Sequence, residues 1–152
     1  MRLCATLVST LLSTLVLSAV GAFADPVESL LSASPFTSKP LYNGDYYTIG
    51  LTLEGCELVK TTSTFDKSGV QEKQVAITMD LSKIDPARVE TSGADVNLWA
   101  LEGEVVHCAD ILGESCIVAE RPGESIPMPK GLDLLAGREH AKAVKAVVES
   151  CQ

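Results

Sequence analysis

The chain contains 152 residues, enough for one domain with its own hydrophobic core. Its 20 acidic residues outnumber its 12 basic residues, which gives a formal net charge of −8 at pH 7. A surface with this balance excludes nucleic acid as the expected partner and is repelled by anionic lipid.

The first 24 residues have the layout of a secretory signal peptide. Arg2 supplies the positive start, an apolar stretch follows at 5–20, and Ala22-Phe23-Ala24 gives the small residues that precede a cleavage point. The apolar stretch is broken by serine and threonine, whereas a membrane span needs about 20 apolar residues. We therefore expect cleavage after Ala24 and a soluble protein, without a stable membrane anchor, in the periplasm or outside the cell. The mature chain would keep 11 basic residues against 20 acidic ones, a net charge of −9.

Residues 25–46 are predicted to form a short helix and an irregular leader. Asp25 is a suitable helix cap and Pro26 a suitable first residue, and Leu30 and Leu31 lie on the face that would dock. The leader and the residue after it are aromatic-rich, and two interpretations stay open. The rings either pin the segment over the core or form a contact surface. The predicted contact residues are Phe36, Tyr42, Tyr46 and Tyr47.

Residues 47–152 are predicted to form a single domain that begins with strands. Apolar residues alternate along 47–53, and a slip in phase at Gly55 indicates a bulge or bend before Cys56 and Leu58 continue the apolar set. A polar turn is expected at Ser68-Gly69, and Pro86 should break the chain after the second strand. The remaining predicted strands lie at 75–81, near 89, at 96–100, at 104–108 and at 116–120.

The last part of the chain is predicted to be an irregular connection at 121–131 and then a helix. From Arg138 onward there is no glycine or proline. Ala141, Val144, Val148 and Cys151 form one apolar stripe, which should pack on the sheet.

Four cysteines remain after cleavage, and an even number in an exported chain favours two disulfides. Three pairings are possible. We favour Cys108 with Cys116, because Gly113 lets the short loop reverse, and Cys56 with Cys151, because the helical stripe points Cys151 at the sheet. No C-x2-C pair exists, which argues against a zinc site or a thioredoxin-like redox pair.

The order of elements predicts an α+β fold, with a bent antiparallel sheet or split barrel of about six strands and a C-terminal helix packed on it, similar to a PH domain. The segments "DLSKIDPARVE", "HC", "SCIV" and a helix ending "VVESC" resemble small exported bacterial proteins of unassigned role. The resemblance implies a body of sheet plus helix, and it assigns no functional residue.

No catalytic motif accompanies this fold: nucleophile elbow, zinc-protease helix and phosphate loop are all missing from the sequence. The two histidines are predicted to be structural, His107 on a strand surface and His140 at the edge of the helical stripe. We expect a non-enzymatic binding or interaction domain of the bacterial envelope, without metal or cofactor, that recognises a protein or small ligand. The alternatives are an inhibitor or immunity protein against a basic toxin or hydrolase, and a small hydrolase with an unrecognised site.

Overall fold

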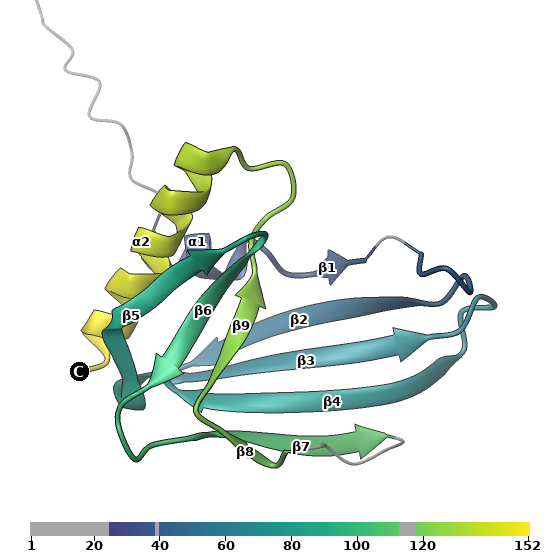
Figure 1. Cartoon of the computed structure of the whole chain (residues 1–152), viewed down its shortest axis with the longest axis horizontal. Coiled ribbons are helices and arrows are strands. Elements are labelled where there is room, and N and C mark those ends of the chain that lie inside the picture. The colour runs from purple at the N-terminus through teal and green to yellow at the C-terminus, as the bar shows by residue number, and fades with distance from the viewer. Residues whose placement is uncertain (1–24, 39, 113–117) are drawn as a thin grey trace, which may run out of the picture.

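The computed structural model describes residues 25–38, 40–112 and 118–152, which form two antiparallel sheets and two α-helices (Figure 1). The predicted α+β class is confirmed. The strands nevertheless divide between two sheets that do not close into a barrel, so the expected single sheet of about six strands is a simplification.

Helix α1 (Pro26–Leu31) begins where the sequence predicts it. The Asp25 side chain accepts a hydrogen bond from the Val27 backbone N–H at 2.8 Å, and Pro26 occupies the first turn. Leu30 is fully buried and α1 packs against the C-terminal helix. The leader that follows contributes the two-residue strand β1 (Phe36–Thr37), which pairs with the next strand.

The larger sheet has the strand order β1-β2-β3-β4-β7-β8. Gly55 takes a positive φ of 59° and Glu54 pairs with Glu57, so the chain reverses at residues 55–56. The expectation of one bent strand through Gly55 is therefore wrong, because a left-handed glycine turns the chain back. The expected turn at Ser68-Gly69 is confirmed. The bounds are β2 (Tyr46–Glu54), β3 (Glu57–Phe65), β4 (Gln71–Asp80), β7 (Val106–Leu112) and β8 (Glu120–Arg121).

The smaller sheet has the order β5-β6-β9 and follows a short 3-10 helix, η1 (Leu81–Lys83). Its strands are β5 (Ile84–Ser92), β6 (Asp95–Ala100) and β9 (Gly123–Pro127). One prediction is confirmed in part and another fails. The second strand is broken as expected, by η1 after Asp80, but Pro86 is not the break: it lies inside β5, where the register with β6 is interrupted between Ile84 and Val89. The segment expected to be irregular contains β9, because its prolines stand beside or at the end of the paired residues.

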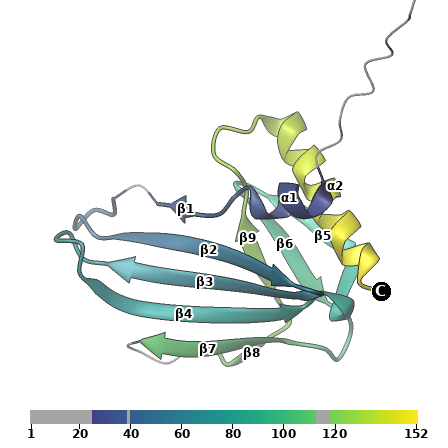
Figure 2. The same ribbon diagram turned by 180° about the vertical axis from the view of Figure 1, so that it is seen from behind.

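Helix α2 (Leu134–Ser150) starts four residues before the predicted start at Arg138, with Asp133 as its cap. The predicted stripe is confirmed: Ala141, Val144 and Val148 are buried. The stripe packs against α1 and β5. Figure 2 shows α1 and α2 side by side at one end of the molecule.

The disulfide between Cys56 and Cys151 is confirmed, with the two Cα atoms 5.7 Å apart. It ties the end of α2 to the β2–β3 turn. Cys108 on β7 is disulfide-bonded as well. Its expected partner, Cys116, lies outside the described residues, as does Gly113. The neighbouring His107 is exposed on the strand, as predicted.

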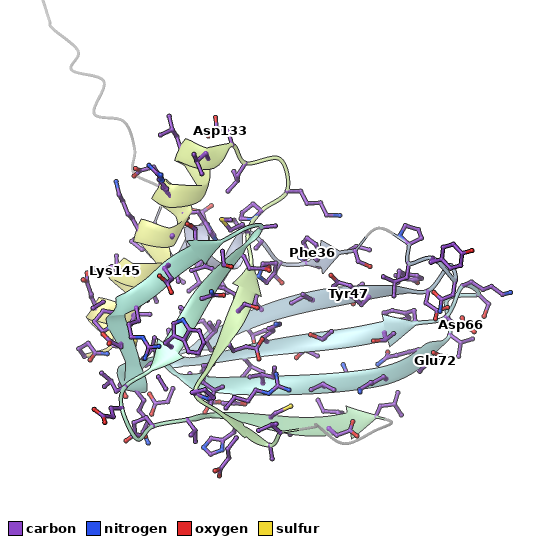
Figure 3. All side chains as sticks on the ribbon, viewed as in Figure 1. Phe36, Tyr47, Asp66, Glu72, Asp133 and Lys145 are labelled. Carbon is purple, nitrogen blue, oxygen red and sulfur yellow. A yellow bond between two sulfur atoms is a disulfide. The ribbon has the colours of Figure 1, made fainter. Side chains whose placement is uncertain are left out.

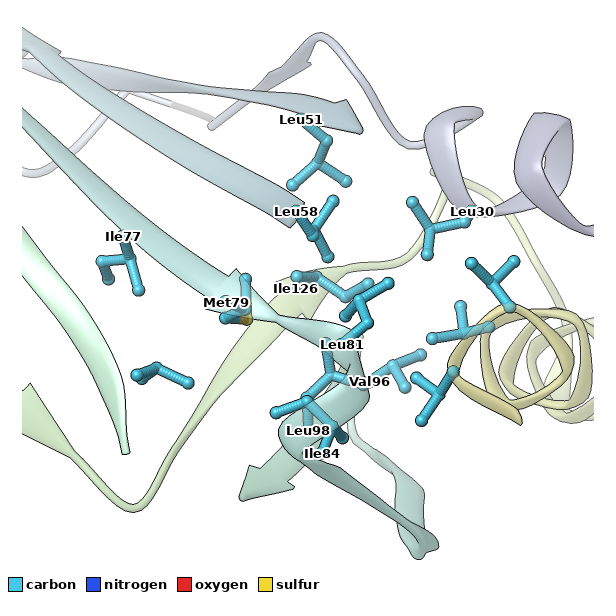
Figure 4. Close-up of a cluster of buried hydrophobic side chains, with 14 of the residues drawn as sticks. Leu30, Leu51, Leu58, Ile77, Met79, Leu81, Ile84, Val96, Leu98 and Ile126 are labelled. Atoms are coloured by element: carbon cyan, nitrogen blue, oxygen red, sulfur yellow. The ribbon is translucent and has the colours of Figure 1, made fainter. Parts of the chain in front are cut away.

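The core lies between the two sheets, at the end of the molecule where α1 and α2 pack against them (Figure 4). Beyond it, β2, β3 and β4 continue outward past the smaller sheet (Figure 1). The fully buried side chains of the core include Leu30, Leu58, Met79, Leu81, Ile84, Val96, Leu98, Val106, Ile126, Val144 and Val148.

Candidate functional site

The first turn of α2 extends past the core and leaves two leucines in solvent. Leu134 is 71% exposed and Leu135 is 70% exposed. Counted backward in steps of three and four, the buried positions 148, 144, 141 and 137 lead to Leu134. The apolar stripe therefore continues to the start of the helix, and within the described part of the chain nothing covers its first turn. Figure 3 marks this end of the helix at Asp133.

The loop before α2 continues the apolar surface around Leu132. A concavity of about 490 Å³ is lined by Phe36, Met128, Pro129, Lys130 and Leu132, with the Gly93–Ala94 turn of the smaller sheet. A second concavity of about 320 Å³ runs between Met128 and Leu134. We call the set Phe36, Met128, Pro129, Leu132, Leu134 and Leu135 the α2 N-terminal surface.

Lys130 fixes the leader strand to this surface. Its ammonium lies 4.9 Å from the centroid of the Phe36 ring and donates a hydrogen bond to the Thr37 carbonyl. Gly137 completes the floor, because a Cβ there would lie only 3.3 Å from the Met128 sulfur. These contacts hold the loop, the leader and the helix together.

The four aromatic residues predicted as a contact surface are not brought together in one place. Phe36 and Tyr47 stack with ring centroids 6.2 Å apart, and both are half-buried (Figure 3). Tyr46 stacks instead on Phe65 at 5.0 Å, and Tyr42 is fully exposed in the loop before β2. Only Phe36 belongs to the α2 N-terminal surface.

His140 lies on the other side of Leu132 and is only 4% exposed. Its Nδ1 is 3.4 Å from the Ser29 hydroxyl, and its buried Nε2 has no hydrogen-bond partner among the residues that the structure describes. Burial lowers the pKa of His140, so the imidazole is neutral at pH 7. A serine beside a histidine is the start of a nucleophile–base pair, but such a pair also needs a group that orients the far nitrogen. The geometry at Nε2 does not supply one, so a packing role fits better.

The sequence interpretation missed the leucines of the α2 N-terminal surface. The signal was present in "GLDLLAG", where Asp133 is a capping residue directly followed by two leucines. Starting the helix at Arg138 placed Leu134 and Leu135 in a connection and hid the fact that Leu134 continues the buried stripe.

Within residues 25–38, 40–112 and 118–152, no three His, Cys, Asp or Glu side chains come together to hold a metal ion. In the same ranges, no helix is long and apolar enough to cross a membrane. No protein-family model matches the chain, and no curated protein or solved structure is significantly similar to it.

Proposed function

We propose that this chain is an exported, non-enzymatic binding domain that holds an apolar segment of a partner protein on the α2 N-terminal surface. The observation that carries the proposal is the exposure of Leu134 and Leu135 beside a concave apolar surface. A leucine that lies on the buried face of a helix and is left in water, with a second exposed leucine next to it, marks an interaction site more specifically than scattered apolar residues do.

The net negative charge of the chain favours a partner with a basic surface. With a net charge of −9 after cleavage at Ala24, the domain attracts a basic protein surface and is repelled by an anionic membrane. We therefore assign as occupant a protein segment that presents aliphatic side chains flanked by lysine or arginine. The aliphatic side chains would fill the concavity beside Met128 and Leu132, and the basic residues would be drawn by the acidic body.

Export of the domain to the periplasm or the cell exterior is part of the proposal. The signal-like sequence of residues 1–24 supports it, and so does the Cys56–Cys151 bridge, because disulfides persist mainly in oxidising compartments.

Photo-crosslinking in the exporting cell tests the proposal. A photo-reactive amino acid in place of Leu134 should yield a crosslink to one protein, and the same amino acid in place of Val70 should not. Val70 is a matched control, because it is an exposed aliphatic residue (60%) in the β3–β4 turn.

The crosslinked protein is then purified and its affinity for the full mature chain is measured. Leu134→Asp with Leu135→Asp should weaken binding at least tenfold, whereas Val70→Asp should leave it unchanged. Acidic residues in the first turn favour the helix, so the double variant should still fold. Crosslinks to lipid alone, equal crosslinking from both positions, or binding unaffected by the double variant would each refute the proposal.

A further inference from the structure

A buried ion pair joins β3 of the larger sheet to β9 of the smaller sheet. Lys60 on β3 donates from Nζ to Glu124 Oε1 at 2.9 Å and to the Ser125 carbonyl at 2.7 Å. The two charged side chains are only 11% and 10% exposed. Burial alone would raise the pKa of Glu124, but the Lys60 charge and hydrogen bonds from Lys60, Ser125 and Arg121 lower it overall. Glu124 is therefore ionised at neutral pH.

Arg121 is held next to this pair. Its Nη1 donates to Glu124 Oε2 at 2.8 Å, its Nε donates to the Val118 carbonyl at 3.3 Å, and its Nη2 lies 4.0 Å from the Cys108 sulfur. A guanidinium has five N–H donors. Glu124, Val118 and Cys108 each engage one of them, so one N–H on Nη1 and one on Nη2 remain for another partner. Because Lys60 already neutralises Glu124, the cluster keeps the positive charge of Arg121, which is 32% exposed.

A concavity of about 240 Å³ opens beside Arg121 over the paired strands β6 and β9, lined also by Asn97, Trp99, Gly123, Glu124 and Ser125. We call it the Trp99 pocket. Among the described residues, no protein group is hydrogen-bonded to the Trp99 indole N–H, the Asn97 side-chain amide or the Ser125 hydroxyl. The Arg88 guanidinium lies 5.0 Å from the Trp99 ring centroid and brings a second cation close to the pocket.

A carboxylate of β5 lies beside the pocket without lining it. Glu90 is opposite Asn97 in the register of the smaller sheet and therefore leaves the same face. Glu90 also lines the groove beside α2, together with Arg138, Lys142 and Lys145.

We propose that the Trp99 pocket binds a small molecule that carries a carboxylate. The guanidinium fork of Arg121 matches the two oxygens of a carboxylate, and its contact with Glu124 fixes its direction in advance. The Asn97 amide and the indole N–H supply further donors. The volume is below the range of about 300 to 1,000 Å³ of pockets for drug-sized ligands, so the ligand is small. This site is separate from the α2 N-terminal surface and does not depend on the proposed protein partner.

The single tryptophan makes the test direct, because the indole N–H of Trp99 gives one isolated signal in a ¹H–¹⁵N spectrum. The full mature protein is titrated with sodium acetate while sodium chloride is reduced to keep ionic strength constant. We expect a saturating shift of the indole signal with acetate and none with neutral acetamide. Arg121→Gln should weaken the apparent affinity at least tenfold, and Arg138→Gln, an exposed arginine on α2, should not change it.

Asn97→Ala provides a second variant that leaves the ion pair intact, and it should weaken acetate binding while the melting temperature stays unchanged. The absence of a saturating acetate shift, an equal shift with acetamide, or retention of binding in both Arg121→Gln and Asn97→Ala would overturn the proposal. A shift that follows ionic strength alone would overturn it as well.

Discussion

At the scale of single residues, Gly123 sets the position of the only tryptophan. A Cβ at this residue would lie 2.5 Å from the Leu98 carbonyl oxygen and 3.0 Å from the Trp99 ring. The neighbouring backbone has no free space to accommodate a methyl group, so strand β9 can lie against β6 only with glycine at this position.

Gly123→Ala should therefore lower the free energy of unfolding by about 1 to 3 kcal/mol, the usual cost of overpacking. Gly50→Ala is the matched control, because a Cβ on that strand residue meets nothing within 4 Å. Removing a flexible glycine from a strand should instead stabilise the protein by about 0.5 to 1 kcal/mol. Urea denaturation followed by circular dichroism measures both, and equal effects of the two substitutions would contradict this packing argument.

Glu124→Gln should cost more than a typical surface substitution, because it leaves the Lys60 ammonium buried without its counter-charge. Loss of one member of a buried pair costs about 3 to 5 kcal/mol. Glu104→Gln, which disrupts the exposed pair between Lys83 and Glu104 (49% and 41% exposed), should stay within experimental error in the same urea denaturation. If Lys60→Met with Glu124→Leu restores the stability that Glu124→Gln loses, the cost came from the unpaired charge.

His140 should make the protein less stable in mildly acidic solution. Its folded pKa is lowered by burial, so below the ordinary value of 6.5 the unfolded chain binds more protons than the folded one. The stability that neutral His140 contributes is present above pH 6.5 and is lost as the pH falls through its folded pKa. Urea midpoints at pH 7.5 and 5.5 should therefore differ less in His140→Leu than in the wild type. His107→Gln, at an exposed strand position, should keep the wild-type difference.

At the scale of elements, the Cys56–Cys151 bridge spans 95 positions of sequence and joins α2 to the β2–β3 turn. Chain-entropy models give about 4.7 kcal/mol for a loop of this length and about 2.5 kcal/mol for the short loop expected between Cys108 and Cys116. Cys151→Ser should therefore lower the melting temperature more than Cys116→Ser. Non-reducing peptide mapping checks the pairing itself, and recovery of Cys56 linked to Cys108 would contradict it.

The elements that the sequence predicted well are those with one clear pattern. The alternation of 47–53, 75–81 and 96–100 and the stripe of α2 each bury one face, so the period of the apolar residues determines the structure. The errors fall where two signals compete. Gly55 both interrupts an alternating pattern and turns the chain, and only the pairing of β2 with β3 decides between a bend and a reversal. The prolines around β9 suggest a loop until their places beside the paired residues are known.

At the scale of the whole molecule, Asp25 is the residue that cleavage after Ala24 is expected to leave as the new N-terminus. Asp25 caps α1, so a cut after Ala24 keeps the cap and a cut one residue later would remove it. We expect the intact mass of the exported protein to lack residues 1–24. A mass that retains them would contradict both the cleavage and the proposed soluble form.

The candidate sites were less predictable than the fold, because they depend on contacts between distant segments. Leu134 is exposed only because no other described element reaches the first turn of α2, and the sequence contains no sign of that. The Trp99 pocket unites β6, β8 and β9. Its Glu124 is paired with Lys60 of β3, and Lys60 falls in a strand pattern that favours an apolar residue. The aromatic residues were a visible signal, but the hairpin sends Tyr46 and Tyr47 to opposite faces of one strand.

The helices and the smaller sheet cover only one end of the larger sheet. We therefore expect two regions of different local stability. Near the helices, Leu51, Leu58 and Met79 are buried, whereas beyond Lys60 every residue of β3 except Ser63 is only half-buried. Amide protons in the outer halves of β2, β3 and β4 should therefore exchange with solvent through local opening of the hairpins, while those near the core wait for global unfolding. The outer region can fray and re-form while the disulfide-anchored end, with both proposed binding sites, stays folded.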